Sequence, residues 1–316
     1  MRNQRTIASE VELEGHGLFT GKPVVVRLRP GGPHTGIWFV RTDQSPPARV
    51  AARIENVSKR ARRTALRNGT AAIETVEHCL SACAGLGIDN LQIELNADEL
   101  PSGDGSCLPF TKSLREAGIT EQEAPREPCV IREVLRVVDG DSELIAVPPL
   151  DPKSETLEVS YELDYGRDNP IGHQAYRVTV TSENYEANLA PARTFVLAEE
   201  AEELRAAGLG LHLTYDDILV FGKDGVIDNQ LRFPDECARH KILDLLGDLA
   251  LLGQPIVGRI FARKSGHALN HTLVRSLRER EDAARQASAL TGPPEIDIRR
   301  LQRILPHRYP FLMIDR

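Results

Sequence analysis

Short apolar runs separated by turn residues dominate the first hundred positions of the chain. Their length and the glycine, proline and serine residues between them are typical of strands in an antiparallel sheet. They occupy residues 23–28, 36–40, 49–54 and 90–95. Residues 70–85 instead carry apolar side chains at helical spacing, and residues 108–117 predict a closing helix. The first part of the chain is therefore predicted to form a sheet with two helices.

The same kinds of pattern return after a polar, proline-bounded stretch at residues 120–128, which has no periodicity and which we interpret as a domain linker. Strand-like runs follow at residues 130–138, 143–147, 157–163 and 175–180. A helix is predicted over residues 233–252, a strand over 256–262 and a further helix over 269–280.

The order helix, strand, loop, helix at residues 70–117 recurs at residues 233–280. This weak internal repeat predicts an α+β two-domain sandwich, in which each domain is a mainly antiparallel sheet with two helices and the helices pack between the two sheets. The expected boundaries are an N-terminal domain at 1–119, a linker at 120–128, a C-terminal domain at 129–284, and a further linker and tail at 285–316.

Charge and cysteine usage narrow the class of partner and the compartment. The net charge of −7 argues against a nucleic acid bound through its phosphates. Five cysteines without a CxxC pair favour a reducing compartment over a disulfide scaffold. No secretory signal and no run of 18 apolar residues is present, so we expect a cytoplasmic protein without an integral membrane segment.

The two predicted helices that begin the repeats carry the most suggestive side chains. His240 and Asp244 are four residues apart and share one helical face, and His78 lies at the equivalent place in the first repeat. Two histidines and one carboxylate form the ligand set of a catalytic zinc with an open position for water. Glu77, next to His78, is then placed to take a proton from that water.

A structural interpretation of the same residues stays open at this level, and from spacing alone it is the favoured one. His240 and Asp244 then form an ordinary pair on a solvated helix face, and His78 is a core histidine. His267 lies in a predicted loop, and a role for it as an acid depends on Asp248 orienting its imidazole and raising its pKa. A metal-free binding module for nucleotide sugars or acyl groups is the alternative from a different class of protein.

Six blocks of the sequence, taken together and in order, closely resemble the UDP-3-O-acyl-N-acetylglucosamine deacetylase family. They are TVEH (75–78), AGLGIDN (84–90), DGS (104–106), ARTF (192–195), RHKILD with GDL (239–249) and KSGHALN (264–270). The resemblance spans residues 3–280. It implies a single-zinc amidase of the cytoplasm that removes acetate from a UDP-linked, 3-O-acylated N-acetylglucosamine, the committed step of lipid A biosynthesis, with iron as an alternative metal and contact with the membrane surface through its lipid substrate.

The resemblance also implies a role for each site residue. The metal ligands are His78, His240 and Asp244. The general base is Glu77, the general acid is His267 supported by Asp248, the oxyanion is stabilised by Thr194, and the substrate is held by Lys241 and Phe195. Two positions depart from the family pattern: Phe19 stands where a histidine is usual, and residues 210–214 (GLHLT) stand where a Gly-Gly pair is usual.

The tail at residues 296–316 resembles the beginning of the hydroxyacyl carrier-protein dehydratase family, after a proline-containing spacer at residues 291–294. Some bacteria join these two enzymes in one polypeptide. The motifs with the catalytic His and Glu of that family are not among these 316 residues, so we expect part of a bifunctional fusion without the second activity.

Overall fold

The computed structural model of the protein describes residues 2–290, with side chains described to residue 287. Residues Met1–Arg275 form one compact unit. Residues 276–316 form a second unit, of which the described part continues helix α6 (His267–Leu290). Most of the predicted tail, residues 291–316, lies outside the described residues.

The first half of the chain builds a five-stranded sheet in the order β2-β3-β9-β4-β5. Its strands are β2 (Val11–His16), β3 (Pro23–Pro30), β4 (Ile37–Arg41), β5 (Ala48–Ala51) and β9 (Leu91–Leu95). All neighbours are antiparallel except β4 and β9, which are parallel. Helices α1 (Glu77–Leu86) and α2 (Leu108–Glu116) pack together, and α2 contacts β2.

The second half builds a sheet in the order β12-β13-β19-β14-β15, with β11 beside β19. Its strands are β11 (Cys129–Val130), β12 (Leu135–Asp139), β13 (Ser142–Val147), β14 (Leu157–Asp164), β15 (His173–Thr179) and β19 (Ile256–Arg263). Strand β19 pairs parallel to β14, as β9 does to β4, and each occupies the centre of its sheet. The strand orders correspond position by position, which confirms the predicted internal repeat.

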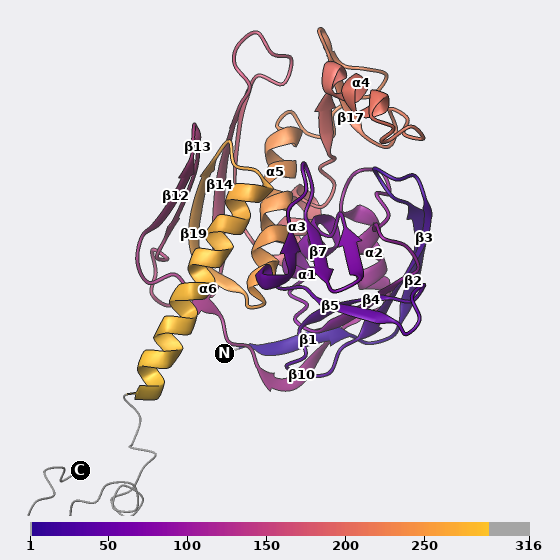
Figure 1. Cartoon of the computed structure of the whole chain (residues 1–316). Coiled ribbons are helices and arrows are strands. Elements are labelled where there is room, and N and C mark those ends of the chain that lie inside the picture. Colours follow the sequence, from indigo (N-terminus) through magenta and orange to yellow (C-terminus); the bar gives the residue numbers. More distant parts are fainter. Residues whose placement is uncertain (1, 291–316) are drawn as a thin grey trace, which may run out of the picture. The chain divides into compact units, whose positions relative to one another are not determined.

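Helices α1 and α5 (Glu236–Leu249) pack against each other and lie between the two sheets (Figure 1). Their contact is close because Gly247 faces the main chain of Glu77, where a Cβ would lie 2.1 Å from the Glu77 carbonyl oxygen. Leu80, Leu243 and Leu246 are buried beside this contact. The predicted α+β sandwich with helices between two sheets is confirmed.

Most of the polar stretch interpreted as a domain linker forms a strand. Strand β10 (Ile119–Pro125) pairs antiparallel with β1 (Asn3–Ile7). Main-chain hydrogen bonds hold the ribbon together while most β10 side chains stay exposed, and only Ala124 is buried. Apolar periodicity could not reveal such a strand because it has almost no buried face. The domain boundaries themselves remain a prediction.

The first predicted helix begins later than its apolar spacing suggested. Residues 71–74 form strand β8 (Ala71–Glu74) in a small sheet with β6 (Val57–Ser58) and β7 (Ala65–Asn68). Thr75 then adopts a φ of 59°, a left-handed conformation that ends the strand, and α1 starts at Glu77. The apolar residues at 71 and 73 face the core from a strand, so it was wrong to count this segment as part of the helix.

A second small sheet, absent from the sequence prediction, lies between β15 and α5 in the chain. It consists of β16 (Phe195–Leu197), β17 (Leu219–Gly222) and β18 (Gly225–Val226), with α4 (Ala198–Ala206) packed on it and α3 (Ser182–Asn188) before it. Two 3₁₀ turns, Ile54–Asn56 and Ala250–Leu252, complete the elements. Among the described residues, no helix has the length and apolarity to cross a bilayer.

Candidate active site

Three potential metal ligands converge where α1 meets α5. The Nε2 atoms of His78 and His240 lie 3.6 and 3.4 Å from Oδ1 of Asp244. One ligand atom from each residue lies within 4.8 Å of the other two, and all three side chains are buried. His78 comes from the first turn of α1, and the other two stand one turn apart on α5. The predicted cluster is therefore assembled in space from two distant segments.

The histidine orientation suits a metal. Nδ1 of His240 lies 3.1 Å from the carbonyl oxygen of Ala192, which accepts its proton and leaves Nε2 facing Asp244. Burial lowers the pKa of His240 to about 4 despite the opposing charge of Asp244, so the imidazole is neutral and able to coordinate. Ligand atoms at about 2.0–2.1 Å from a tetrahedral ion stand about 3.4 Å apart, which matches the His–Asp distances seen here.

Lys241 forms a hydrogen bond with the second carboxylate oxygen of Asp244. Its Nζ donates to Oδ2 at 3.0 Å, and the same ammonium lies 5.6 Å from the ring centre of Phe195. Burial opposes the charge of Lys241, yet Asp244 and neighbouring tyrosines outweigh it and raise the lysine pKa. Burial likewise opposes the Asp244 carboxylate, but His240 and Lys241 hold its pKa well below the usual range. Asp244 is thus ionised, with Oδ1 left facing the histidines.

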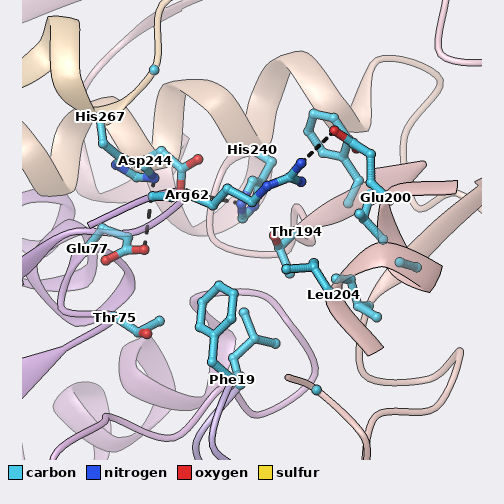
Figure 2. Close-up of a pocket in the computed structure, with 18 of the residues that line it drawn as sticks. Phe19, Arg62, Thr75, Glu77, Thr194, Glu200, Leu204, His240, Asp244 and His267 are labelled. Carbon is cyan, nitrogen blue, oxygen red and sulfur yellow. Dashed lines mark hydrogen bonds and ion pairs between the residues drawn. The ribbon is translucent and has the colours of Figure 1, made fainter. Parts of the chain in front are cut away.

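Glu77 and His267 face each other at one end of the cavity (Figure 2). Oε1 of Glu77 lies 4.0 Å from Nε2 of His267, and Oε2 accepts a hydrogen bond from the main chain of Thr64 at 3.1 Å. Burial raises the pKa of Glu77, and the neighbouring histidines partly offset this. A carboxylate with a raised pKa is the stronger base, and a divalent cation beside it would keep it ionised.

Asp248 holds the other side of the His267 ring. Nδ1 of His267 donates to Oδ2 of Asp248 at 2.8 Å, and Asp248 is fully buried. Burial alone would lower the pKa of His267, but the charge and hydrogen bond of Asp248 outweigh it and raise that pKa to about 9. The imidazole is therefore protonated at neutral pH. The sequence predicted that His267 lies in a loop. This prediction is wrong, because His267 is the first residue of α6.

These groups open onto a cavity of about 770 Å³. Thr194 and Phe195 line it where the chain enters β16. Phe19 also lines it, and the guanidinium carbon of Arg63 lies 4.0 Å from the centre of the Phe19 ring. Its apolar wall includes Ala201, Leu204, Leu209, Leu213 and Val220. The structure thus brings all nine predicted site residues to one place: eight of them, Glu77 and His267 included, line the cavity, and Asp248 lies behind His267.

Sequence reasoning missed several groups around this cavity. Arg62 reaches across it and donates to Glu200 of α4 at 2.8 Å (Figure 2). His271 lies one turn after His267 on α6 and contacts Asp248 at 3.2 Å, so its i,i+4 spacing was the available signal. Thr64 contacts Asp248 and Glu77, but nothing in the sequence near residue 64 indicated this.

The class of protein follows from this arrangement. A buried group of two histidines and an aspartate, flanked by a carboxylate and a protonated histidine, defines a metal-dependent amidohydrolase. Residues 4–279 match the family described as LpxC, UDP-3-O-acyl N-acetylglycosamine deacetylase, and the chain belongs to this family.

Three curated relatives carry the name UDP-3-O-acyl-N-acetylglucosamine deacetylase. The protein from Myxococcus xanthus is 39% identical over 277 residues, which cover 87% of this chain and 86% of the relative. The protein from Anaeromyxobacter is 39% identical over 300 residues, covering 94% and 95%. The protein from Syntrophus aciditrophicus is 37% identical over 289 residues, covering 91% and 90%. The similarity therefore extends over nearly the whole of each protein.

Proposed function

We propose that this protein hydrolyses the acetamide of UDP-3-O-[(3R)-3-hydroxyacyl]-N-acetylglucosamine, releasing acetate and a free amine, as the committed step of lipid A biosynthesis. The observation that supports it best is the placement of His78, His240 and Asp244 beside both Glu77 and His267, in a chain of the deacetylase family. Amide hydrolysis needs a polarised carbonyl, an activated water and a proton for the leaving nitrogen. One side of this cavity holds groups for all three.

We further propose one zinc ion per chain, held by the two Nε2 atoms and by Oδ1 of Asp244. Bound zinc would lower the pKa of water and polarise the acetyl carbonyl. The same nitrogen and oxygen donors accept iron, so the metal in the cell is Zn²⁺ or Fe²⁺.

Glu77 and His267 divide the proton transfers. Oε1 of Glu77 takes a proton as the water oxygen forms a bond to the carbonyl carbon. Nε2 of His267 then gives its proton to the amide nitrogen as the carbon–nitrogen bond breaks, leaving acetate and an amine. The raised pKa of Glu77 makes it a stronger base, and the raised pKa of His267 keeps the imidazole protonated at neutral pH and so able to serve as the acid. Asp248 keeps the imidazole oriented throughout.

The remaining site residues bind and stabilise. We assign the Thr194 hydroxyl to the negative charge that develops on the carbonyl oxygen. Lys241 and Phe195 hold the polar part of the substrate, and the apolar wall formed by Leu204, Leu213 and their neighbours takes the acyl chain. Phe19 adds an aromatic face to this chamber where the family usually has a histidine.

Metal analysis of the purified protein tests the proposed chemistry most directly. We expect about one zinc per chain, lost on chelation together with deacetylase activity and restored with it on adding Zn²⁺. Full turnover in a metal-free preparation would favour a metal-independent reaction. Parallel reconstitution with Fe²⁺ under anaerobic conditions distinguishes the two metals.

Two further statements remain proposals. We expect the protein to act in the cytoplasm and to approach the membrane surface through its lipid substrate or product. We also propose that residues 296–316 are the beginning of a hydroxyacyl carrier-protein dehydratase segment. A coupled assay for dehydration of a hydroxyacyl carrier protein, run on this chain, is expected to show no turnover.

A further inference from the structure

The Asp248 carboxylate is contacted by four hydrogen-bonding groups, and three of them come from residues without an assigned role. His267 and Asn270 each contact Oδ2 at 2.8 Å. The Thr64 hydroxyl contacts Oδ1 at 2.5 Å, and Nε2 of His271 contacts it at 3.2 Å. A carboxylate offers about four lone-pair sites, so this one is saturated and cannot rotate without breaking hydrogen bonds.

Thr64 also contacts Glu77 through its main chain. Its N–H donates to Oε2 at 3.1 Å, while its single hydroxyl proton goes to Asp248. The lone pairs of the same hydroxyl face Nε2 of His271 at 3.1 Å and Nδ1 of His267 at 3.2 Å. One residue therefore touches the carboxylate assigned as base and the carboxylate that orients the acid.

The position of Thr64 is itself fixed by the fold. The residue is fully buried directly before β7, and its carbonyl oxygen accepts a hydrogen bond from the N–H of Val76 at 3.2 Å. Val76 directly precedes α1, the helix that begins with Glu77. Thr64 is thus tied by main-chain hydrogen bonds to the helix of the base and by its side chain to Asp248 of α5.

We propose that Thr64 is a positioning residue of the deacetylation, which sets the separation between the Glu77 carboxylate and the His267 imidazole by holding Glu77 with its N–H and Asp248 with its hydroxyl. The inference rests on the proposed function. Base and acid must face the same amide, with Oε1 and Nε2 now 4.0 Å apart. Small displacements of catalytic groups cost large factors in rate, whereas they change ground-state binding much less.

The test compares three substitutions at this position. Thr64→Val replaces the hydroxyl by a methyl group of similar size, Thr64→Ala removes it without crowding Oδ1, and Thr64→Ser keeps it. The matched control is Thr6→Val, because Thr6 is also buried and its hydroxyl also both donates and accepts hydrogen bonds, in its case with main-chain groups outside the cavity, at 2.7 Å to Asn90 and 3.0 Å from Gly31.

We expect Thr64→Val and Thr64→Ala to lower kcat about ten- to hundredfold, with KM within about twofold and zinc content unchanged. Thr64→Ser should retain most of the wild-type kcat, and Thr6→Val should lose stability but not kcat. A second readout is the Nδ1–H proton resonance of His267 in protein with ¹⁵N-labelled histidine. It should shift in Thr64→Val, where Asp248 is released on one side, and stay in Thr6→Val.

The outcomes separate the role of Thr64 from the function of the protein. A folded Thr64→Val with nearly wild-type kcat, or a loss of rate that follows zinc loss, would overturn the positioning role while leaving the deacetylase intact. Failure of both Thr64→Val and Thr64→Ala to fold would mean that the hydroxyl serves the structure alone. Absence of turnover in the wild-type holoenzyme would instead count against the proposed function.

Discussion

Gly247 of α5 lies against the main chain of Glu77 in α1, so closely that a Cβ would sit 2.1 Å from the Glu77 carbonyl oxygen and 2.9 Å from its Cα. The atoms in the way belong to the backbone, which cannot give way as a flexible side chain can. The distance between the helix that carries the proposed base and the helix that carries two of the proposed metal ligands is therefore set by the absence of a side chain.

Gly247→Ala is expected to destabilise the protein by at least about 1–3 kcal/mol, the usual cost of overpacking, and to weaken metal binding by pushing α1 from α5. Urea unfolding and zinc content are the measurements. Gly32→Ala is the control, because its Cβ would make only an ordinary contact of 3.5 Å with Thr35. Equal stability of both variants would show that the helices can separate without cost.

Removing each ligand should differ from removing the base. His78→Ala, His240→Ala and Asp244→Ala should each lower both zinc content and turnover, because each deletes one of three protein ligands. Glu77→Gln should keep the metal and lose about a hundred- to ten-thousandfold in kcat, the usual contribution of a general base. Zinc content by atomic absorption, measured beside kcat, separates the two patterns. Near wild-type turnover of Glu77→Gln would assign the base elsewhere.

The alkaline limb of the pH profile should report His267. In the proposed mechanism its protonated form is the acid, so activity should be present below its pKa, about 9, and be lost as the pH rises through that value. Asp248→Asn removes the charge that raises this pKa, and the limb should therefore move to lower pH. The profile of kcat/KM at fixed zinc, for wild type and both Asp248→Asn and His267→Ala, is the measurement. An alkaline limb unchanged in both variants would exclude His267 as the acid.

A buried ion pair should be needed to hold the Thr194–Phe195 segment. Glu236 accepts hydrogen bonds from the main chain of Arg193 at 3.0 Å and from its Nε at 2.9 Å, and both residues are buried. Glu236→Ala leaves a buried guanidinium without its partner, which costs about 3–5 kcal/mol.

Thermal unfolding checks this expectation, with Glu10→Ala as the control. Glu10 pairs with Arg29 on the surface, with half of each side chain exposed, so its loss should hardly move the midpoint. A midpoint shift of the same size in both variants would show that the buried Arg193–Glu236 pair contributes no more to stability than the exposed pair does.

Much of the fold could be predicted because the strands of the two large sheets alternate between buried and more exposed residues, while the helices between the sheets carry apolar residues at helical spacing. The strands at residues 143–147 and 157–163 have one apolar face, and α5 has a continuous buried side. The segments that were misread lack this property. Strand β10 is polar on nearly every face. In β8 and the following Thr75, the apolar residues happen to fit the spacing of the helix that comes after them.

The candidate site was accessible from sequence only where spacing or resemblance marked it. The i,i+4 spacing of His240 and Asp244 made them candidates, since both had to face one side of one helix, but only the family resemblance favoured a metal site over an ordinary pair. Thr64 gave no such signal, because its role depends on a main-chain N–H and on a partner 184 residues away. Arg62 and Glu200 meet only because two small sheets flank the same cavity.

The proposed metal ligands are divided unequally between the repeats, with one on α1 and two on α5. Neither helix alone offers a complete set, so metal affinity depends on the docked state of the two halves. By linkage, bound metal must stabilise that docked state in return, by about 2.7 kcal/mol when the free ion stands at a hundred times its Kd. The zinc ion would then stabilise the contact between the two repeats, and removing it would lower the stability of the protein as well as its activity.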